Sequence, residues 1–384
     1  MANLIERVGG LPADPSLRQS YQQEIGQLLR TDGSRFPGAQ PVSFSRAHRE
    51  ELKRQDYFVC EKTDGVRYLM YLTHDDQGGP CHYLIDRKNE YYYIRNLYFP
   101  HHENKNTFHR DTLLDGELVE DKYPDGRTVR KFLVFDCLVM DKKDLRDRTL
   151  DKRLGYLKEF LLKPMNKMFA EYPGRRDEMA FRVEDKKTEF SYSLDKMFHE
   201  IIPQVKQLHG NDGLIFTCKN TPYKSGTDPH ILKWKPPEEN TVDFLLHLEW
   251  SQMQPHPDDA DQAPQDDYDA LPNASLYIYV GNRNEYAYKD RLHLTIEDWD
   301  NMKSHNKPLQ YCIVECFQEE SSEGNRWRFH RFRDDKTDAN HVSTYDSVID
   351  SISDHVTEQD LLHWADEIRT AWKSREQKAR QAQR

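Results

Sequence analysis

Residues 57–72, YFVCEKTDGVRYLMYL, constrain the fold more than any other stretch, because two strand patterns meet there at a charged bend. Apolar residues alternate or cluster on both sides of the bend, as they do in buried strands. The bend holds Thr63-Asp64-Gly65, which suits a tight turn. The stretch is either an ordinary hairpin whose charges face water, or it holds Lys62 as a nucleophile at the mouth of a nucleotide pocket.

Most of the remaining chain carries strand patterns, interrupted by a few helical stretches. Before residue 240, strands are predicted at 81–86, 91–95, 112–120, 131–140, 213–218 and 231–234, and helices at 17–29, 153–160 and 193–208. Later strand patterns at 242–250, 276–280, 311–318 and 326–332 have the spacing of a small barrel. Apolar residues then recur at helical spacing from 345 to 373.

The length of 384 residues exceeds the usual size of one domain, so at least two are expected. We place a larger domain at 1–240, a barrel domain at 241–341 and terminal helices at 342–384. No apolar run approaches the roughly 20 residues of a membrane span. The N-terminus also lacks the basic and apolar segments of a signal peptide, so no membrane association is expected.

The net charge of -11 argues superficially against a nucleic-acid partner. Six aspartates and no basic residue lie in 255–270, which we interpret as a disordered acidic insertion. The local field, not the net charge, decides how a phosphate is bound. The six cysteines are scattered through apolar segments without zinc-site spacing, which predicts buried, reduced thiols.

Charged residues recur at the ends or in the middle of the predicted strands. The motifs are K-T-D-G-V-R (62–67), D-G-E-L (115–118), F-D-C (135–137), D-G-L-I-F (212–216), L-K-W-K-P (232–236) and R-x-R-x-D-K (331–336). Each motif alone has an ordinary interpretation, such as a hairpin turn, an exposed strand face or a satisfied buried carboxylate. Together they supply the cations and carboxylates of one phosphate-handling cleft.

In this order the motifs resemble those of the covalent nucleotidyltransferases, which include mRNA capping guanylyltransferases and ATP-dependent ligases. The resemblance is greatest to the fungal capping guanylyltransferases, and it covers nearly the whole chain. Ala339 departs from the proline expected before Asn340, at the rim of the last motif. The resemblance implies an α+β fold with a nucleotidyltransferase (ligase-like) domain of antiparallel sheets and helices. It also implies a C-terminal OB-fold barrel, and terminal helices that pack back on the larger domain.

The resemblance further implies a two-step reaction. Lys62 would attack the α-phosphate of GTP, release pyrophosphate and then pass GMP to a 5'-diphosphate RNA end. A lysine attacks only as the free amine, which neighbouring cations and a bound Mg²⁺ or Mn²⁺ would favour. The alternative is an ATP-dependent polynucleotide ligase that uses the same lysine.

Site roles come from the same resemblance. Besides the catalytic Lys62, the expected nucleotide-binding residues are Glu61, Thr63, Asp64, Gly65, Arg67, Arg87, Glu117, Phe135, Lys187, Ile215, Lys233, Lys235, Arg331, Arg333 and Lys336. Arg67 and Glu117 would hold the ribose. Either Lys186 or Lys187 would donate to the guanine carbonyl. Asp212 is the expected metal ligand, ahead of Asp64.

Two roles depend on residues that lie far apart in the sequence. Phe135 and Ile215 would sandwich the purine, while Lys235, with Lys233 nearby, would bind the α-phosphate. The cations of 331–336 would meet the β- and γ-phosphates when the barrel domain closes.

The expected partners follow from the chemistry of the RNA end. Only 61 residues precede Lys62, and none of the six cysteines follows a histidine, so we expect a separate RNA 5'-triphosphatase subunit. The resemblance also implies binding to the phosphorylated C-terminal tail of RNA polymerase II, and hence a nuclear location.

Overall fold

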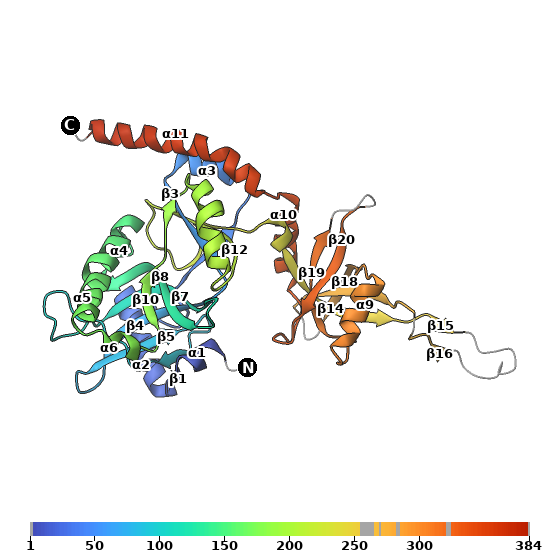
Figure 1. Ribbon diagram of the computed structural model, residues 1–384, viewed down its shortest axis with the longest axis horizontal. Coiled ribbons are helices and arrows are strands. Elements are labelled where there is room, and N and C mark those ends of the chain that lie inside the picture. The colour runs from blue at the N-terminus through green and yellow to red at the C-terminus, as the bar shows by residue number, and fades with distance from the viewer. Residues whose placement is uncertain (1–2, 254–264, 269, 282–284, 320–323, 383–384) are drawn as a thin grey trace. The chain divides into compact units, whose positions relative to one another are not determined.

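The structure is a computed structural model that describes residues 3–253, 265–268, 270–281, 285–319 and 324–382. The chain divides into two compact units (Figure 1). Unit 1 comprises residues 1–234 and 358–384, and unit 2 comprises residues 235–357. None of the described helices combines the length and apolar character needed to span a membrane.

Unit 1 contains an eight-stranded sheet in the order β1-β6-β5-β4-β7-β8-β10, with β9 paired to β8. Its strands are β1 (Leu11–Pro12), β4 (Val66–His74), β5 (Pro80–Ile85), β6 (Tyr91–Tyr93), β7 (Thr112–Lys122), β8 (Thr128–Met140), β9 (Lys143–Asp144) and β10 (Arg182–Asp185). All the pairs are antiparallel except β8 with β10.

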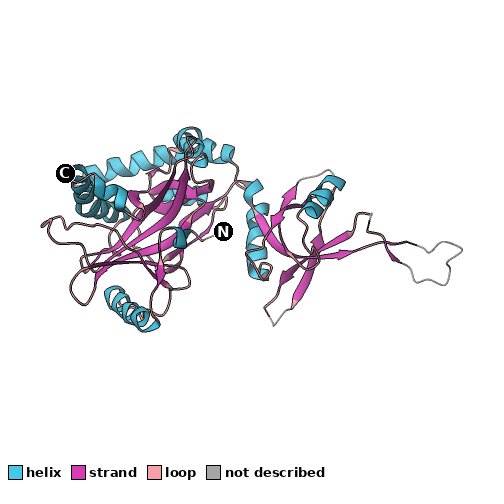
Figure 2. Ribbon diagram, turned by 60° about the horizontal axis from the view of Figure 1, so that its bottom comes forward, coloured by secondary structure: helices cyan, strands magenta, loops and turns pink. Residues whose placement is uncertain are grey.

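The second sheet of unit 1 has the order β11-β3-β12-β13-β2. Its strands are β2 (Ala39–Ser43), β3 (Tyr57–Thr63), β11 (Glu189–Phe190), β12 (Asn211–Cys218) and β13 (Gly226–Trp234). Only β13 and β2 run parallel. The helices of unit 1 lie outside the two sheets (Figure 2).

The helical elements of unit 1 include two π-helical turns, η1 and η2. Their bounds are α1 (Leu4–Arg7), α2 (Pro15–Leu29), α3 (His48–Arg54), α4 (Leu150–Tyr156), η1 (Leu157–Leu162), α5 (Lys163–Glu171), α6 (Gly174–Glu178), α7 (Leu194–Lys196), η2 (Met197–Ile201), α8 (Ile202–Lys206) and α11 (Glu358–Ala382). The C-terminal helix α11 lies beside α3, although the two are far apart in sequence (Figure 1). Arg49 of α3 pairs with Glu367 of α11 at 2.7 Å.

Both faces of the large sheet are buried, which explains the continuous apolar run of β4. Met70 belongs to the core formed with η1 and α5, through residues such as Leu161. Tyr71, its neighbour, belongs to the opposite core, where Ile25 of α2 packs. Successive side chains of a strand point to opposite faces, so the strand buries nearly every residue.

The charged bend between β3 and β4 connects the two sheets and is not a hairpin. β3 pairs with β11 and β12, whereas β4 pairs with β5 and β7. The hairpin interpretation is therefore wrong. Gly65 packs so tightly that an added Cβ would lie 2.8 Å from both the Glu117 and Val119 side chains, so this position requires glycine.

Unit 2 is built on a five-stranded antiparallel sheet in the order β18-β17-β14-β19-β20. Its elements are η3 (a 3₁₀ turn, Pro237–Glu239), β14 (Thr241–Glu249), β15 (Gln252–Met253), β16 (Gln265–Asp266), β17 (Asn273–Tyr279), β18 (Tyr286–Arg291), α9 (Ile296–Ser304), β19 (Ile313–Glu319), β20 (Arg326–Phe332) and α10 (Val342–Ser353). Leu292, just after β18, bridges to Trp327 of β20, so the two edge strands meet as in an OB-like barrel. The predicted α+β fold class is confirmed.

The terminal helical region divides between the two units. Residues of α10, including Val348 and Ile352, pack on the apolar core of unit 2, whereas α11 belongs to unit 1. The expectation that all of 342–384 packs on the larger domain is therefore corrected for α10. The boundary between the units falls after Trp234 rather than after residue 240. Most of the acidic segment 255–270 lies outside the described residues.

Candidate active site

A pocket lies between the two sheets of unit 1, and residues from both sheets line it. Seven of the predicted site residues line this pocket: Lys62, Thr63, Arg67, Arg87, Glu117, Phe135 and Ile215. Phe135 comes from β8 of the large sheet and Ile215 from β12 of the small one. Two side chains on facing sheets can sandwich a flat ring, which is the role predicted for this pair.

The alternation of side chains along β3 directs Lys62 into the pocket. Phe58, Cys60 and Lys62 are two residues apart and all line the pocket. The Lys62 Nζ donates to both carboxylate oxygens of Asp212, at 2.6 and 2.7 Å. Both side chains keep 24% of their surface exposed, so the pair is accessible to a ligand.

A β-bulge places Asp212 beside Lys62. The pairing of β12 with β3 shifts register between Asn211 and Leu214, and Gly213 adopts φ 144° there. A bulge bends one strand and re-aims a side chain, and this backbone region favours glycine. The Asn211 side chain fixes the bulge by donating to the carbonyls of Lys62 (3.0 Å) and Gly213 (2.8 Å). The Asp-Gly pair is therefore part of the site and not a hairpin turn.

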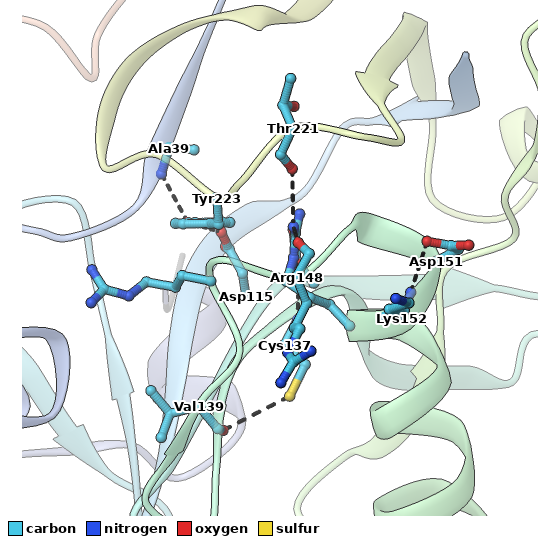
Figure 3. A network of polar contacts seen from close by, with 12 residues as sticks. Ala39, Asp115, Cys137, Val139, Arg148, Asp151, Lys152, Thr221 and Tyr223 are labelled. Carbon is cyan, nitrogen blue, oxygen red and sulfur yellow. Dashed lines mark hydrogen bonds and ion pairs between the residues drawn. The ribbon is translucent and has the colours of Figure 1, made fainter.

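Arg67 is anchored in the pocket wall by a buried network that includes Asp115 and Tyr223. Figure 3 shows Asp115 and Tyr223 with Ala39, a further member of this network. The Arg67 guanidinium donates to both oxygens of Asp115, at 3.0 and 2.6 Å, and Tyr223 donates its hydroxyl to the same carboxylate at 2.5 Å. The Ala39 amide in turn donates to the Tyr223 hydroxyl at 2.8 Å. Burial of Arg67 opposes its charge, but Asp115 raises its pKa above the usual range. The Arg67 carbon Cζ also lies 5.4 Å from the Phe135 ring centre.

Lys186, not Lys187, lines the pocket, which corrects the predicted choice between these two lysines. The buried Lys186 Nζ donates to Thr63 and, at 3.2 Å, to Glu117. Lys187 is exposed and does not line the pocket. Strand alternation could have identified Lys186. Phe181 and Val183 face the core, so the even-numbered residues that follow in this segment, including Lys186, are expected on the opposite face.

Glu61 faces away from Lys62 along β3 and does not line the pocket. It is buried, and its carboxylate oxygens lie 3.3 Å from His209 Nε2. The other ring nitrogen of His209 lies 2.6 Å from Asp121. Burial opposes a charge on His209, but Asp121 and Glu61 raise its pKa to about 9. Glu61 therefore supports the strand beneath the lysine, and it does not bind nucleotide directly in this arrangement.

Comparisons with known proteins match both units. The family model described as mRNA capping enzyme, catalytic domain, matches residues 5–237, and the model of the capping enzyme C-terminal domain matches residues 239–362. The mRNA-capping enzyme subunit alpha of Neurospora crassa is 46% identical over 385 residues, covering 97% of this chain and 94% of that protein. The chain belongs to the mRNA capping enzyme family.

Other capping enzymes are similar over most of this chain. The mRNA-capping enzyme subunit alpha of Schizosaccharomyces pombe is 44% identical over 355 residues, or 91% of this chain and 85% of that protein. The mRNA-capping enzyme of Caenorhabditis elegans is 28% identical over 91% of this chain but only 52% of its own length. The resemblance inferred from the ordered motifs is confirmed, and so is the prediction of a capping-type nucleotidyltransferase.

The two lysines of the capping enzyme's L-K-W-K-P motif lie in different units. Lys233 pairs in register with Ile215, which pairs with Cys60 on β3. Residues directly opposite in neighbouring strands share a face, so Lys233 lies on the pocket face of the sheet. Lys235 follows β13 and is the first residue of unit 2. Neither lysine is among the residues that line the pocket itself.

The cations of the R-x-R-x-D-K motif are paired within unit 2. Arg331 lies 2.6 Å from Glu315, and Arg333 lies 3.0 Å from Asp243. Lys336 also pairs with Asp243, which is buried. Asp335 contacts Arg333 at 2.8 Å, and this contact lowers the pKa of Asp335 to about 2. Acidic residues of the same unit thus hold all three cations in position.

The remaining predicted residues lie at the edge of the site. Asp64 and Gly65 form the bend after Lys62, and they are not among the lining residues. Asp136 lines the pocket, and its two oxygens accept hydrogen bonds from Arg153 at 2.7 and 2.8 Å. Tyr223 and Asp115 also line the pocket, although no role was predicted for either of them from the sequence. Nothing in the segment around Tyr223 marks it, because it lies in a loop without periodicity.

Proposed function

We propose that this chain transfers GMP from GTP to the 5'-diphosphate end of RNA through a covalent intermediate on Lys62. The Lys62 amine attacks the α-phosphorus of GTP, forming a P–N bond while the bond to pyrophosphate breaks. In the second step an oxygen of the RNA diphosphate attacks the same phosphorus, and Lys62 recovers its amine. The observation that carries this proposal is that Lys62 lines a pocket between two sheets and pairs there with Asp212.

The pocket offers separate groups for each part of the nucleotide. Phe135 and Ile215 face the space from opposite sheets and would hold the purine between them. Lys186 is the group we assign to the guanine carbonyl, because its ammonium is buried in the same wall. Glu117 and Arg67 would hold the ribose hydroxyls. A buried donor such as Lys186 disfavours a base that offers it no acceptor.

Asp212 is the residue that would hold a divalent metal. A carboxylate oxygen suits Mg²⁺ or Mn²⁺, and the Asp212 side chain is partly exposed at the pocket. The residue fits this role, because its two oxygens already hold a positively charged group, the Lys62 side chain. When bound, the metal would supply positive charge that favours the neutral amine and offsets charge on the phosphate.

Cations on both units would stabilise the phosphate charge. Lys233 lies on the pocket face of its sheet, and we assign it with Lys235 to the α-phosphate. We assign Arg331, Arg333 and Lys336 to the departing pyrophosphate. These three cations are paired with carboxylates of unit 2, so phosphate oxygens would replace Glu315 and Asp243 as their partners.

A second subunit would supply the diphosphate RNA end. The relatives are named subunit alpha, which implies a further subunit in their enzymes. Burial raises the pKa of all six thiols of this chain, whereas a phosphatase cysteine needs a lowered one. We therefore propose a separate RNA 5'-triphosphatase as the partner. We also propose recruitment by the phosphorylated tail of RNA polymerase II in the nucleus.

The proposal is tested by comparing RNA substrates that end in a 5'-diphosphate with substrates that end in a 5'-triphosphate. Purified chain with GTP and a divalent metal should cap diphosphate-ended RNA and leave triphosphate-ended RNA uncapped. ATP in place of GTP should give no product on either RNA. Capping of triphosphate RNA with release of its γ-phosphate, in proportion to enzyme, would overturn the separate-subunit proposal. Sealing of a nicked duplex with ATP would instead support a ligase.

A further inference from the structure

A second cluster of chemically active side chains lies in unit 1, outside the nucleotide pocket. His101, His102 and His109 come from one loop, and Asp141 follows the end of β8. One potential ligand atom from each of the four lies within 4.8 Å of all the others. None of these four residues lines the nucleotide pocket.

The loop is folded back on itself so that its histidines converge. Pro100 and Phe108 form an antiparallel bridge between its two arms. The His101 amide donates to the Thr107 carbonyl at 2.9 Å, and the His109 amide donates to the Phe99 carbonyl at 2.9 Å. The backbone therefore fixes the base of the cluster independently of its side chains.

The buried ring of His109 has a defined orientation. Its Nε2 lies 2.8 Å from the Phe160 carbonyl oxygen in η1, and since a carbonyl only accepts, Nε2 must carry the hydrogen. Its Nδ1 lies 2.9 and 3.1 Å from the two oxygens of Asp141. Nδ1 is therefore the ring nitrogen of His109 that can ligate a cation lying between His109 and Asp141.

The other two histidines complete a set of four ligands around this point. His101 Nε2 lies 3.4 Å from the Asp141 carboxylate. The ring centre of His101 is 4.4 Å from that of His102 and 5.0 Å from that of His109. Ligand atoms of a tetrahedral zinc site are about 3.3–3.7 Å apart, given bonds of about 2.0–2.2 Å. His109 Nδ1 and the Asp141 oxygens are slightly closer than this, at 2.9 and 3.1 Å, and would move apart a little around an ion. Rotation of the less buried rings of His101 and His102 would bring their nitrogens to the same ion.

We propose that His101, His102, His109 and Asp141 bind one Zn²⁺ ion as a structural site. Imidazole nitrogens favour zinc over Mg²⁺ or Ca²⁺, which prefer sites made of oxygen ligands. Histidine ligands usually donate their second ring N–H to a carbonyl or carboxylate, as His109 does to Phe160. Four protein ligands close the coordination shell, so the ion would link the loop to the end of β8 and, through Phe160, to η1.

The experiment uses the untagged full chain, stripped with a chelator and then equilibrated with Zn²⁺. After removal of unbound metal, elemental analysis should give about one zinc per chain. Zinc should also raise the melting temperature, because a ligand of the folded state stabilises it. Co²⁺ in place of Zn²⁺ should give the visible absorption of a tetrahedral site.

Variants of the cluster distinguish a metal site from a set of side chains that only contact one another. Asp141→Asn and His101→Gln each remove one ligand, and the His101 side chain is partly exposed rather than part of the core. Both should lose bound zinc and its thermal effect, whereas His199→Gln, an exposed histidine of η2 outside the cluster, should keep both. Substoichiometric zinc in the unaltered chain, or equal zinc in all variants, overturns the proposal. Guanylylation of Lys62 is a separate readout, so failure of one proposal leaves the other testable.

Discussion

The Lys62 ammonium lies 2.6 and 2.7 Å from the two carboxylate oxygens of Asp212, on neighbouring strands of one sheet. This pair holds the nucleophile in place. Asp212 therefore has two proposed roles: it positions Lys62, and it would hold the divalent metal.

Asp212→Asn keeps the shape of the side chain but removes the charge that serves both roles. We expect about a 10- to 100-fold loss in the rate of Lys62 guanylylation, with a higher metal concentration needed for half-maximal rate. Label incorporation from α-labelled GTP across a series of metal concentrations measures both effects. Asp125→Asn is the matched control, since Asp125 also precedes a glycine but lies in an exposed turn. An unchanged metal requirement in Asp212→Asn would exclude Asp212 as the metal ligand.

Lys186 and Lys187 offer a comparison between adjacent residues. Lys186→Met removes a buried donor, and we expect about a tenfold or larger rise in the KM for GTP. Lys187→Met should stay within about twofold, because its side chain is exposed and outside the pocket. Initial rates of label incorporation at varied GTP, with melting curves to check folding, make the comparison. Equal effects of the two substitutions would contradict the assignment of Lys186 to the base.

Arg333 and Lys336 should affect one half-reaction more than the other. Alanine at either position should slow GMP loading by about 10- to 1,000-fold, because these cations would meet the leaving pyrophosphate. Transfer from a preformed lysyl-GMP enzyme to diphosphate RNA should change far less. Arg328→Ala loses comparable ion pairs in unit 2, with Asp298 and Glu319, and serves as the control. Variants that load normally but fail in transfer would refute the pyrophosphate role.

Because its pKa is raised, His209 should stabilise the fold by an amount that depends on pH. Its pKa is about 9 in the folded chain and 6.5 for an ordinary histidine. A raised pKa stabilises the fold fully below about pH 6.5, and this stabilisation is lost as the pH rises through about 9. His209→Gln should therefore cost up to about 3 kcal/mol more near pH 6 than near pH 9.5.

Denaturant unfolding at several pH values measures this difference. His199→Gln provides the control, because that histidine is exposed and contacts Asp195 on its own helix. A stability difference between the unaltered chain and His209→Gln that does not shrink toward pH 9.5 would contradict a charged His209 between Glu61 and Asp121.

Local patterns predicted the strands well where one or both faces are buried. The apolar runs of β7 and β8 were predicted within a few residues of their observed ends, because their side chains fill two cores. β18 was missed, since none of its residues is buried and no apolar alternation marks them. The helical spacing after residue 345 predicted terminal helices but not the position of the break between α10 and α11.

The candidate site was predictable in its residue types and less so in its contacts. The Asp-Gly pair at 212–213 was recognised, but only the pairing of β12 with β3 shows that a bulge turns Asp212 toward Lys62. The choice between Lys186 and Lys187 depended on which face of the chain meets the pocket. Pairing partners such as Asp115 for Arg67 depend on long-range packing, which no single sequence segment encodes.

The most direct test of the central claim is label transfer from α-labelled GTP to the protein itself, read on a denaturing gel. The unaltered chain should carry an acid-labile, alkali-stable label on Lys62, and α-labelled ATP should give none. Lys62→Arg keeps the positive charge, but its guanidinium stays protonated and cannot attack, so no label should appear. Labelling of Lys62→Arg by GTP, or of the unaltered chain by ATP in place of GTP, would contradict guanylyl transfer through Lys62.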